Sequence, residues 1–487
     1  MAAPAQRKHH PPNPSHSNIS PPTLLPSPTA LPLLNTALLV FLRYGLIFAT
    51  DIPAILANRV EASTPVTSFK RLQEGLYLFR HGITPYDGSI YYQAPLLLPI
   101  FHFIPPFLHS TIFILLDIAV AYFLLQIAIY KSSCDTQEVW PKPVIVETKV
   151  VQGEALEGDD DVRKETEKAE EKNEPHVVEG DYDPKRDPTR PDDSSTRLSP
   201  HTIATLYLLN PYAIIACLAK STQLFSSLGA VMGIYFATRG KLPPAMLCLA
   251  VATYLSFYPL VLLAPVALLL SDTRKTSVLN ITTTSIPLFT VYLGGLLGVS
   301  YLLAGSWQFL SSTYGAILFV PDLTPNIGLF WYFFIEMFDH YRTFFLCVFQ
   351  IFVFVFVVPI SVKFRSHPLF VASLLMAIVA IFKSYPSVAD TSIYTSLFLM
   401  HSELFKYMRN TYLAINGMVY ASVLGPLFHH LWLYAGSGNA NFFFAITLVW
   451  AMAQVFGILD ACYAMQRREW DRRWPGLRVA RVEVVHK

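Results

Sequence analysis

The chain has 487 residues, of which 53% are hydrophobic and 14% aromatic, and its mean hydropathy is positive. This composition excludes a set of ordinary soluble domains and indicates a polytopic membrane protein. The formal net charge of +2 hides an acidic stretch, residues 131–200, which holds 19 acidic residues against 11 lysines and arginines. The five cysteines have no paired spacing, so neither a disulfide framework nor a zinc site is indicated.

The first 200 residues are predicted to carry two membrane spans between polar segments. Residues 1–30, rich in Pro, Ser and His, are expected to form a disordered tail. Residues 31–130 hold spans at about 31–49 and 106–130, separated by a long loop at 50–93. In that loop, residues 68–80 have the pattern of an amphipathic helix on the membrane surface. The charged residues 131–200 are expected to form a disordered acidic insert.

The remaining chain is predicted to form a membrane core, residues 201–465, followed by a basic tail, residues 466–487. Several of its apolar stretches are short or interrupted by Pro and Gly, as broken membrane helices are. Together with the first two spans they predict an all-α fold of about twelve transmembrane helices. The ten stretches are 201–219, 222–238, 243–258, 259–271, 281–304, 329–360, 368–382, 387–401, 410–434 and 442–465.

The basic residues predict the orientation of these spans. The loops near 240, 274, 364 and 406 and the start of the basic tail hold 12 lysines and arginines. The short loops on the opposite side hold two, Lys220 and Lys383. Because cytosolic loops carry the excess of Lys and Arg, both termini and the insert are expected in the cytosol. The loop 50–93 and the segment 321–345 then lie together on the other face.

The segment 321–345, PDLTPNIGLFWYFFIEMFDHYRTFF, concentrates polar, aromatic and turn-forming residues in an otherwise apolar chain. Asp322 and Thr324 indicate a turn, and Asn326 is predicted to be the N-cap of the helix that follows. The aromatic run is typical of a belt at the membrane–water interface.

Further along the same predicted helix, Glu336, Asp339 and His340 lie at positions i, i+3 and i+4, so they are expected to share one helical face. This pattern is a weak metal motif, and interface anchoring or contact with a polar head group is the favoured interpretation. The sequence therefore indicates neither a metal nor a cofactor.

Two further loops on the same face have a related character. Residues 381–394 place Lys383, Tyr385 and Asp390 around a proline, and residues 431–448 contain Asn439 and Asn441 in a Gly/Ser/Asn turn. Hydroxyls, amides and backbone N–H groups at helix ends suit sugar and phosphate groups. For the second loop, ordinary turn chemistry explains the residues equally well.

Few residues indicate catalysis. Asp117 and Asp460 lie isolated within spans, and a structural helix–helix hydrogen bond is the favoured interpretation of each. The sequence contains no G-x-S-x-G elbow, no H-E-x-x-H motif and no glycine pattern for phosphates or dinucleotides. We therefore expect a chain that is not itself an enzyme.

The segment 321–345, together with IFKSYPSVAD, YAGSGNANFFFAITL and RVEASTPVTSFKRLQEGLYL, resembles the PIG-U family of glycosylphosphatidylinositol (GPI) transamidase subunits. This resemblance implies a multi-pass protein of the endoplasmic reticulum membrane within a five-subunit complex. In that complex a cysteine-protease subunit transfers a GPI lipid to proteins. The PIG-U subunit is implied to be a non-catalytic component that recognises the lipid or the C-terminal attachment signal. The implied partners are the other subunits, the lipid and the membrane, and no nucleic acid.

A second similarity keeps an enzyme as the alternative. Residues 81–99, HGITPYDGSIYYQAPLLLP, are similar to the first lumenal loop of GPI mannosyltransferases, which have a multi-span GT-C fold. Those enzymes need paired acids after the first span, whereas this loop offers Asp51 alone, with Glu61 ten residues further on. We therefore expect an enzyme-type fold reused for binding. A lumenal mannosyltransferase and a purely structural scaffold remain the alternatives.

The leading hypothesis is a GPI-binding site on the lumenal face. Its aromatic members would pack acyl chains, and its polar members would face the glycan or phosphate. The proposed ligand-binding residues are Asp322, Thr324, Asn326, Phe330, Trp331, Phe333, Phe334, Glu336, Asp339, Lys383, Tyr385, Asp390, Asn439 and Asn441.

Overall fold

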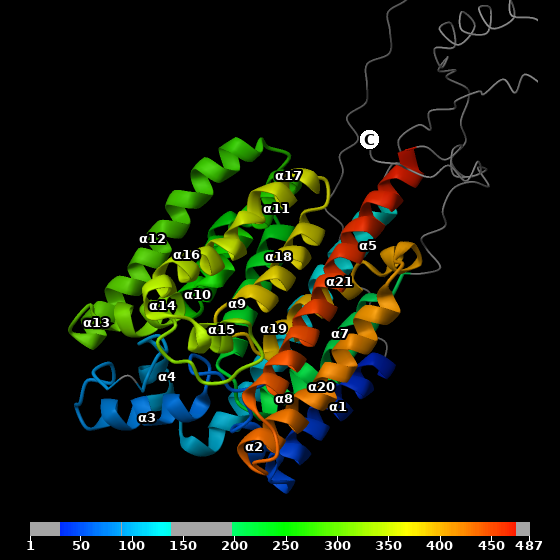
Figure 1. The fold of residues 1–487 in the computed structure, drawn as a ribbon. Helices are drawn as coiled ribbons and strands as arrows, with labels where there is room; N and C mark the ends of the chain where they lie inside the picture. The colour runs from blue at the N-terminus through cyan, green and yellow to red at the C-terminus, as the bar shows by residue number, and fades with distance from the viewer. Residues whose placement is uncertain (1–29, 89, 138–196, 474–487) are drawn as a thin grey trace, which may run out of the picture.

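The computed structural model describes residues 30–88, 90–137 and 197–473 (Figure 1). Within these ranges every regular element is a helix. A helix satisfies its own backbone hydrogen bonds, so it is the element that an apolar chain can form without water. All but the last residue of the tail expected at 1–30 and most of the insert expected at 131–200 lie outside the described residues, as does the end of the basic tail.

The N-terminal part contains one complete long helix and several short ones. The helix α5 continues beyond residue 130, so its last seven residues are helical where the sequence predicts the start of the insert. The helix predicted at 68–80 is confirmed as α3, with Phe69, Leu72 and Leu76 buried on one side. The elements are α1 (Ala30–Ala49), α2 (Ile52–Leu56), α3 (Phe69–Arg80), α4 (Leu97–Phe103), the 3-10 turn η1 (Pro106–Leu108) and α5 (His109–Gln137).

After the insert, one or more helices overlap each of the ten predicted stretches. The first is a bent pair, α7 and α8, which meet at 53° at the Asn210–Pro211 break. The elements up to the middle of the chain are α7 (Pro200–Leu209), α8 (Pro211–Leu218), α9 (Gln223–Thr238), α10 (Leu242–Leu255), η2 (Tyr258–Leu262), α11 (Leu263–Arg274) and α12 (Val278–Ala304).

The second half of the core contains one long stretch that is broken. The single helix expected over 329–360 is divided, because Met337 and Phe338 are extended. The elements are α13 (Gln308–Leu310), the π turn η3 (Ser311–Gly315), α14 (Ala316–Phe319), α15 (Phe330–Glu336), α16 (Asp339–Val355), α17 (Val357–Lys363), α18 (Pro368–Phe382), α19 (Val388–Leu399), η4 (Ser402–Tyr407), α20 (Thr411–Leu433) and α21 (Ala440–Arg473).

Fewer helices have the length of a membrane span than the sequence predicts. In the described ranges five are long and apolar enough, and the bent pair α7–α8 makes a sixth. Four shorter apolar helices, of 10–17 residues, accompany them. The all-α class is confirmed, whereas the count of about twelve spans is not. The five are Pro106–Asp135, Val278–Ala304, Asp339–Lys363, Thr411–Leu433 and Ala440–Arg473.

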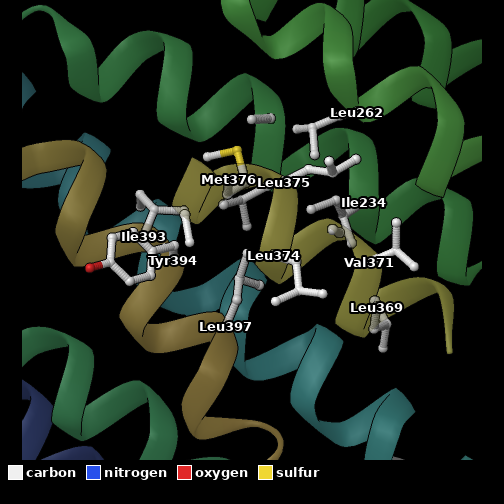
Figure 2. Close-up of a cluster of buried hydrophobic side chains, with 14 of the residues drawn as sticks. Ile234, Leu262, Leu369, Val371, Leu374, Leu375, Met376, Ile393, Tyr394 and Leu397 are labelled. Carbon is white, nitrogen blue, oxygen red and sulfur yellow. The ribbon is translucent and has the colours of Figure 1, made fainter. Parts of the chain in front are cut away.

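The helices at the centre of the bundle are apolar on every side. Residues 368–381 of α18 are all buried, as expected of a helix that is hydrophobic all round. Figure 2 shows Leu374 and Leu375 of α18 among side chains of α9, α19 and η2. This core joins segments from both halves of the chain.

Asp117 and Asp460, the two acids that stand alone within spans in the sequence, both have polar partners in the structure. Asp117 of α5 is not isolated, because its Oδ2 lies 2.7 Å from Nε of Arg43 in α1, and both side chains are fully buried. Tyr207 of α7 donates a hydrogen bond to the other carboxylate oxygen at 2.7 Å. Asp460 of α21 accepts from the backbone N–H groups of Arg409 and Asn410, each at 2.8 Å. The predicted hydrogen bond between helices is confirmed for Asp117, whereas Asp460 bonds the backbone of the segment that precedes α20.

Candidate functional site

Three loops from distant parts of the chain meet at the end of the bundle where α2, α3 and α15 lie (Figure 1). Nη2 of Arg71 in α3 lies 2.7 Å from Oδ2 of Asp322. The hydroxyl of Tyr385 donates to the backbone carbonyl of Asp322 at 2.8 Å. The backbone N–H of Val388 donates to the carbonyl of Glu61 at 3.0 Å. The loop after α2, together with α3, and the loops before α15 and α19 therefore form one connected surface.

The predicted turn at residues 322–326 is built by side chains that bond to their own backbone. Oδ1 of Asp322 accepts from the backbone N–H of Thr324 at 3.0 Å and also from its hydroxyl. Burial tends to raise the pKa of Asp322, but these bonds and the Arg71 guanidinium outweigh it and hold the pKa below its ordinary value. Asp322 therefore carries a negative charge that is already compensated.

Asn326 does not have the predicted role of N-cap. Its Oδ1 accepts from the backbone N–H of Gly328 at 2.8 Å, within a local turn. The helix begins later, at Phe330, and its N-cap residue Leu329 makes no side-chain cap bond. Asn326 is almost completely buried, so it shapes the loop from within.

The aromatic side chains of α15 pack inside the protein. Trp331 is 1% exposed, and its ring lies 5.8 Å from that of Phe443 and 6.0 Å from that of Trp432. Phe330, Phe333 and Phe334 surround Phe349 of α16, with ring centroids 4.9 to 5.4 Å apart. These residues join α15 to three other helices, α16, α20 and α21.

The helical face predicted for Glu336, Asp339 and His340 is wrong. Glu336 is the last residue of α15 and Asp339 is the first residue of α16, with extended backbone between them. All three side chains are exposed. In the described part of the chain, no group of three or more His, Cys, Asp or Glu residues is arranged to hold a metal.

The loop at 383–390 is held by a buried ion pair. Nζ of Lys383 lies 2.7 Å from Oδ2 of Asp390. The same oxygen accepts the backbone N–H of Ser387 at 3.0 Å, and Oδ1 accepts from Nε2 of Gln223 at 3.0 Å. Asp390 thereby closes the N-terminus of α19. Lys383 and Asp390 are satisfied by each other and by this loop.

The turn before α21 contains the last two predicted residues. Oδ1 of Asn439 accepts from the backbone N–H of Phe442 at 3.2 Å, in the first turn of α21. Oδ1 of Asn441 accepts from the hydroxyl of Tyr332 in α15. Both asparagines thus fix the turn and its contact with α15.

A pocket with about 640 Å3 of empty space, part of it open to the outside, lies beside these loops. The residues predicted from the sequence are not among those that line it, but their neighbours Ile327, Val388 and Phe443 are. The lining residues come from the end of α2 and the loop after it, from α8, from the loop at 327, from the first residue of α19, and from α20 and α21. They are Leu56, Arg59, Glu61, Ala62, Tyr212, Ile215, Ile327, Val388, Ala421, Ser422, Gly425, Pro426, Phe443, Ile446, Thr447 and Trp450.

The pocket is apolar over most of its wall and carries one pair of charged side chains. Nε of Arg59 lies 3.4 Å from Oε2 of Glu61. Burial raises the pKa of Glu61, and the Arg59 guanidinium opposes this shift only in part. Two further lining residues, Tyr212 and Ser422, have their hydroxyls 2.8 Å apart. Such a site suits a ligand with a long apolar part and a small polar group.

Sequence reasoning missed Arg59, Tyr212 and Trp450 as site residues. Arg59 and Glu61 stand in RVEASTP, where the resemblance to the family is the signal that marks them in the sequence. Asp51, the acid considered for catalysis, is exposed at the start of α2 and makes no cap bond there. Of the two acids considered in the first loop, it is Glu61 that reaches the pocket.

Comparison with known proteins identifies the family. A family model described as "GPI transamidase subunit PIG-U" matches residues 37–450. The GPI-anchor transamidase component PIGU of Homo sapiens is 35% identical over 449 residues, covering 91% of this chain and 95% of that protein. The protein of the same name from Cricetulus griseus is 36% identical over 432 residues, covering 87% and 91%. The GPI transamidase component GAB1 homolog of Schizosaccharomyces pombe is 31% identical over 426 residues, covering 88% and 91%. The chain therefore belongs to the PIG-U family of GPI transamidase subunits.

Proposed function

We propose that this chain is a non-catalytic membrane component of a GPI transamidase that holds the GPI lipid in the pocket beside α20 and α21. The observation that carries the proposal is the make-up of that pocket. Segments from the resembling motifs surround it, and its wall is apolar except for a few polar groups. The chain would present the lipid to a cysteine-protease subunit in the membrane of the endoplasmic reticulum.

The residues predicted from the sequence then act mainly as the frame of the site. Trp331 lies behind Phe443, which lines the pocket. Asn326 and the Lys383–Asp390 pair fix the loops that carry Ile327 and Val388 to the wall. The exposed Glu336 and Asp339 would meet the glycan outside the pocket, beside the exposed Asn441 that holds Tyr332. The C-terminal attachment signal of a protein is the alternative occupant.

Filling the pocket tests this proposal. Gly425→Leu adds a side chain to the wall, and the nearest atom to its Cβ is Cγ2 of Ile446 at 4.0 Å. The new side chain therefore enters empty space without a clash at its first atom. A matched control is Gly294→Leu in α12, where no atom lies within 4 Å of the added Cβ.

We expect Gly425→Leu to lower both co-purified GPI lipid and anchor attachment several-fold, while Gly294→Leu leaves both unchanged. The other subunits would still co-purify with both variants. If attachment persists in the filled variant at the wild-type level, the chain acts as a scaffold and the lipid binds elsewhere.

We also propose that the chain crosses the membrane about twelve times, in a GT-C-like arrangement with both termini in the cytosol. The positions of the basic segments and of the pocket loops in the structure support this topology. Nε of Arg274 donates to the carbonyl of Gly240 at 2.7 Å, and Nε2 of His367 lies 3.2 Å from Oε1 of Glu469, so four of the basic segments meet in two pairs. The loops around the pocket lie at the opposite end of the bundle (Figure 1).

A glycosylation acceptor introduced at 305–320 should be modified, and one in the insert should not. The reverse pattern would invert the topology.

A further inference from the structure

Two turns at the end of the bundle opposite the pocket bring several positive charges together. The first joins the end of α11 to α12 at residues 272–277, and the second joins α17 to α18 at residues 363–367 (Figure 1). Helix α11 contacts both α12 and α17. Burial raises the pKa of Asp272 in the first turn, and the charge of Arg365 in the second turn opposes this shift. The two turns therefore form one patch. This patch, the basic corner, consists of Arg274, Lys275, Lys363 and Arg365.

The basic corner carries an excess of positive charge. All four of its side chains are exposed, and Asp272 is the one acid in the sequence of the two turns. Nε of Arg274 donates to a backbone carbonyl of the neighbouring α9–α10 turn. Lys275, Lys363 and Arg365 have no ion pair within the described ranges. Their charges are therefore available to a negatively charged partner.

Lys275 holds its charge in a backbone conformation that favours glycine. Its φ is +52°, in the left-handed region at the end of α11. Glycine is the usual residue at this position of a helix, because it has no Cβ to crowd the backbone. A lysine there makes the fold less stable than a glycine would. Strain of this kind points to a role of the side chain outside the fold.

Exposed apolar side chains begin directly beside these cations. Leu279, at the start of α12, and Val362, which precedes Lys363 in α17, are each 71% exposed. In the most apolar stretch of α12, 11% of the residues are buried, so the apolar surface continues along that helix. Cations at the end of an exposed apolar surface match a phospholipid, with its phosphate at the cations and its acyl chains on the helices. An acidic peptide would leave the apolar side chains uncovered.

We propose that the basic corner binds a phospholipid whose head group carries a net negative charge, with its phosphate at Lys275, Lys363 and Arg365 and its acyl chains along α12 and α17. A zwitterionic lipid such as phosphatidylcholine gains less from the excess positive charge. The corner and the pocket lie at opposite ends of the bundle, so the two proposals stand or fall separately (Figure 1).

The experiment compares the lipids that remain bound to the purified complex. Wild type, Lys275→Gly/Arg365→Gln and the control Lys70→Gln/Arg80→Gln are placed in nanodiscs of phosphatidylcholine with a minor share of phosphatidylserine. The lipids that stay bound after transfer to detergent are counted by native mass spectrometry. The control removes the same number of charges from exposed positions of α3. Glycine fits the backbone at position 275, so the melting temperature of the corner variant should not fall.

We expect wild type and the control to retain phosphatidylserine in preference to phosphatidylcholine. The variant Lys275→Gly/Arg365→Gln should lose this preference by about tenfold, because each cation near a membrane surface strengthens the binding of an anionic lipid. High salt should weaken the preference of wild type, since it screens exposed charges. Equal retention of phosphatidylserine by both variants overturns the proposal. Displacement of the lipid from wild type by soluble glycerophosphoserine, which has no acyl chains, also overturns it and leaves a simple phosphate site.

Discussion

At the scale of single residues, Arg43 holds together a helix that is broken inside the apolar bundle. Besides its ion pair with Asp117, its Nη2 donates to the carbonyl of Leu208 at 2.9 Å. Leu208 lies in the last turn of α7, where the break before Pro211 removes helical partners. A broken helix at membrane depth is tolerated when neighbours satisfy the freed backbone groups. Arg43 does this from α1.

We predict that Arg43→Ala lowers the free energy of unfolding by roughly 3–5 kcal/mol, because Asp117 is left as a buried charge without a partner. Thermal unfolding of the purified protein in detergent measures the change. Arg80→Ala, at an exposed position of α3, serves as the control and should have little effect. The double variant Arg43→Met/Asp117→Leu should recover much of the loss. If it is no more stable than the single variant, the charge is not what Arg43 compensates.

The two acids beside the pocket should respond to pH in opposite directions. Burial raises the pKa of Glu61 above its ordinary 4.5, so its contribution to stability is full below that pH and is lost as the pH rises through the raised pKa. The pKa of Asp322 is held below its ordinary 3.8, so its contribution is full above that pH and is lost as the pH falls through the lowered pKa.

Melting temperatures of wild type, Glu61→Gln and Asp322→Asn on both sides of these values test this prediction. As the pH rises above 4.5, the melting temperature of wild type should fall relative to that of Glu61→Gln, because the buried Glu61 then loses its proton. The melting-temperature advantage of wild type over Asp322→Asn should shrink as the pH falls below 3.8. If melting temperature varies with pH in the same way in all three proteins, the pKa shifts assigned to Glu61 and Asp322 are wrong.

The sequence indicated which residues were unusual but not what they contact. Asp117 was expected to be isolated because its partner Arg43 lies 74 residues earlier, on another helix. Lys383 and Asp390 were expected to face a ligand, yet they bind each other. Pairing of this kind depends on helix packing, which no local pattern encodes.

At the scale of elements, apolar length predicted the helices well and their interruptions poorly. Pro211 marks the break between α7 and α8 in the sequence. By contrast, Met337 and Phe338 carry no such signal, so the stretch 329–360 was expected to be one helix. The face proposed for Glu336 and Asp339 failed for this reason, since its spacing holds only in a continuous helix.

The contact between the loops before α15 and α19 depends on a glycine. A Cβ added at Gly328 would lie 2.6 Å from Cδ of Pro386 and 2.8 Å from Oδ1 of Asn326. We predict that Gly328→Ala destabilises the protein by about 1–3 kcal/mol, because a proline ring cannot give way easily. Gly298→Ala in α12, where no atom lies within 4 Å, is the control. Equal melting temperatures for both variants would show that the loops separate freely.

At the scale of the whole molecule, charge predicted which loops lie together, because the excess of Lys and Arg is a property of entire loops. The pocket could not be predicted in the same way. It is lined by segments that span residues 56 to 450, and each contributes only a few side chains. Such a site exists only after the helices have packed, although its neighbourhood was marked by the motifs.

The two ends of the described chain that flank the insert are joined by a group of ion pairs. Nζ of Lys131 lies 2.7 Å from Oδ2 of Asp135 and 2.7 Å from Oε1 of Glu403. Nε of Arg197 lies 3.8 Å from Oδ2 of Asp135. The backbone N–H of Leu198 also donates to the hydroxyl of Ser402 at 2.9 Å. The chain therefore leaves the bundle at α5 and returns beside the same place.

Because the ends already meet, we predict that replacing residues 140–195 with a short Gly–Ser linker leaves insertion, melting temperature and anchor attachment near wild type. Closing a shorter loop lowers the entropy lost on folding, so the core itself gives no reason for a defect. The same replacement combined with Asp135→Ala and Lys131→Ala should melt earlier, since the buried carboxylate of Glu403 then loses its lysine partner. If the linker variant alone inserts and melts normally but fails to recover the other subunits or to attach anchors, the acidic insert is a docking element for a partner.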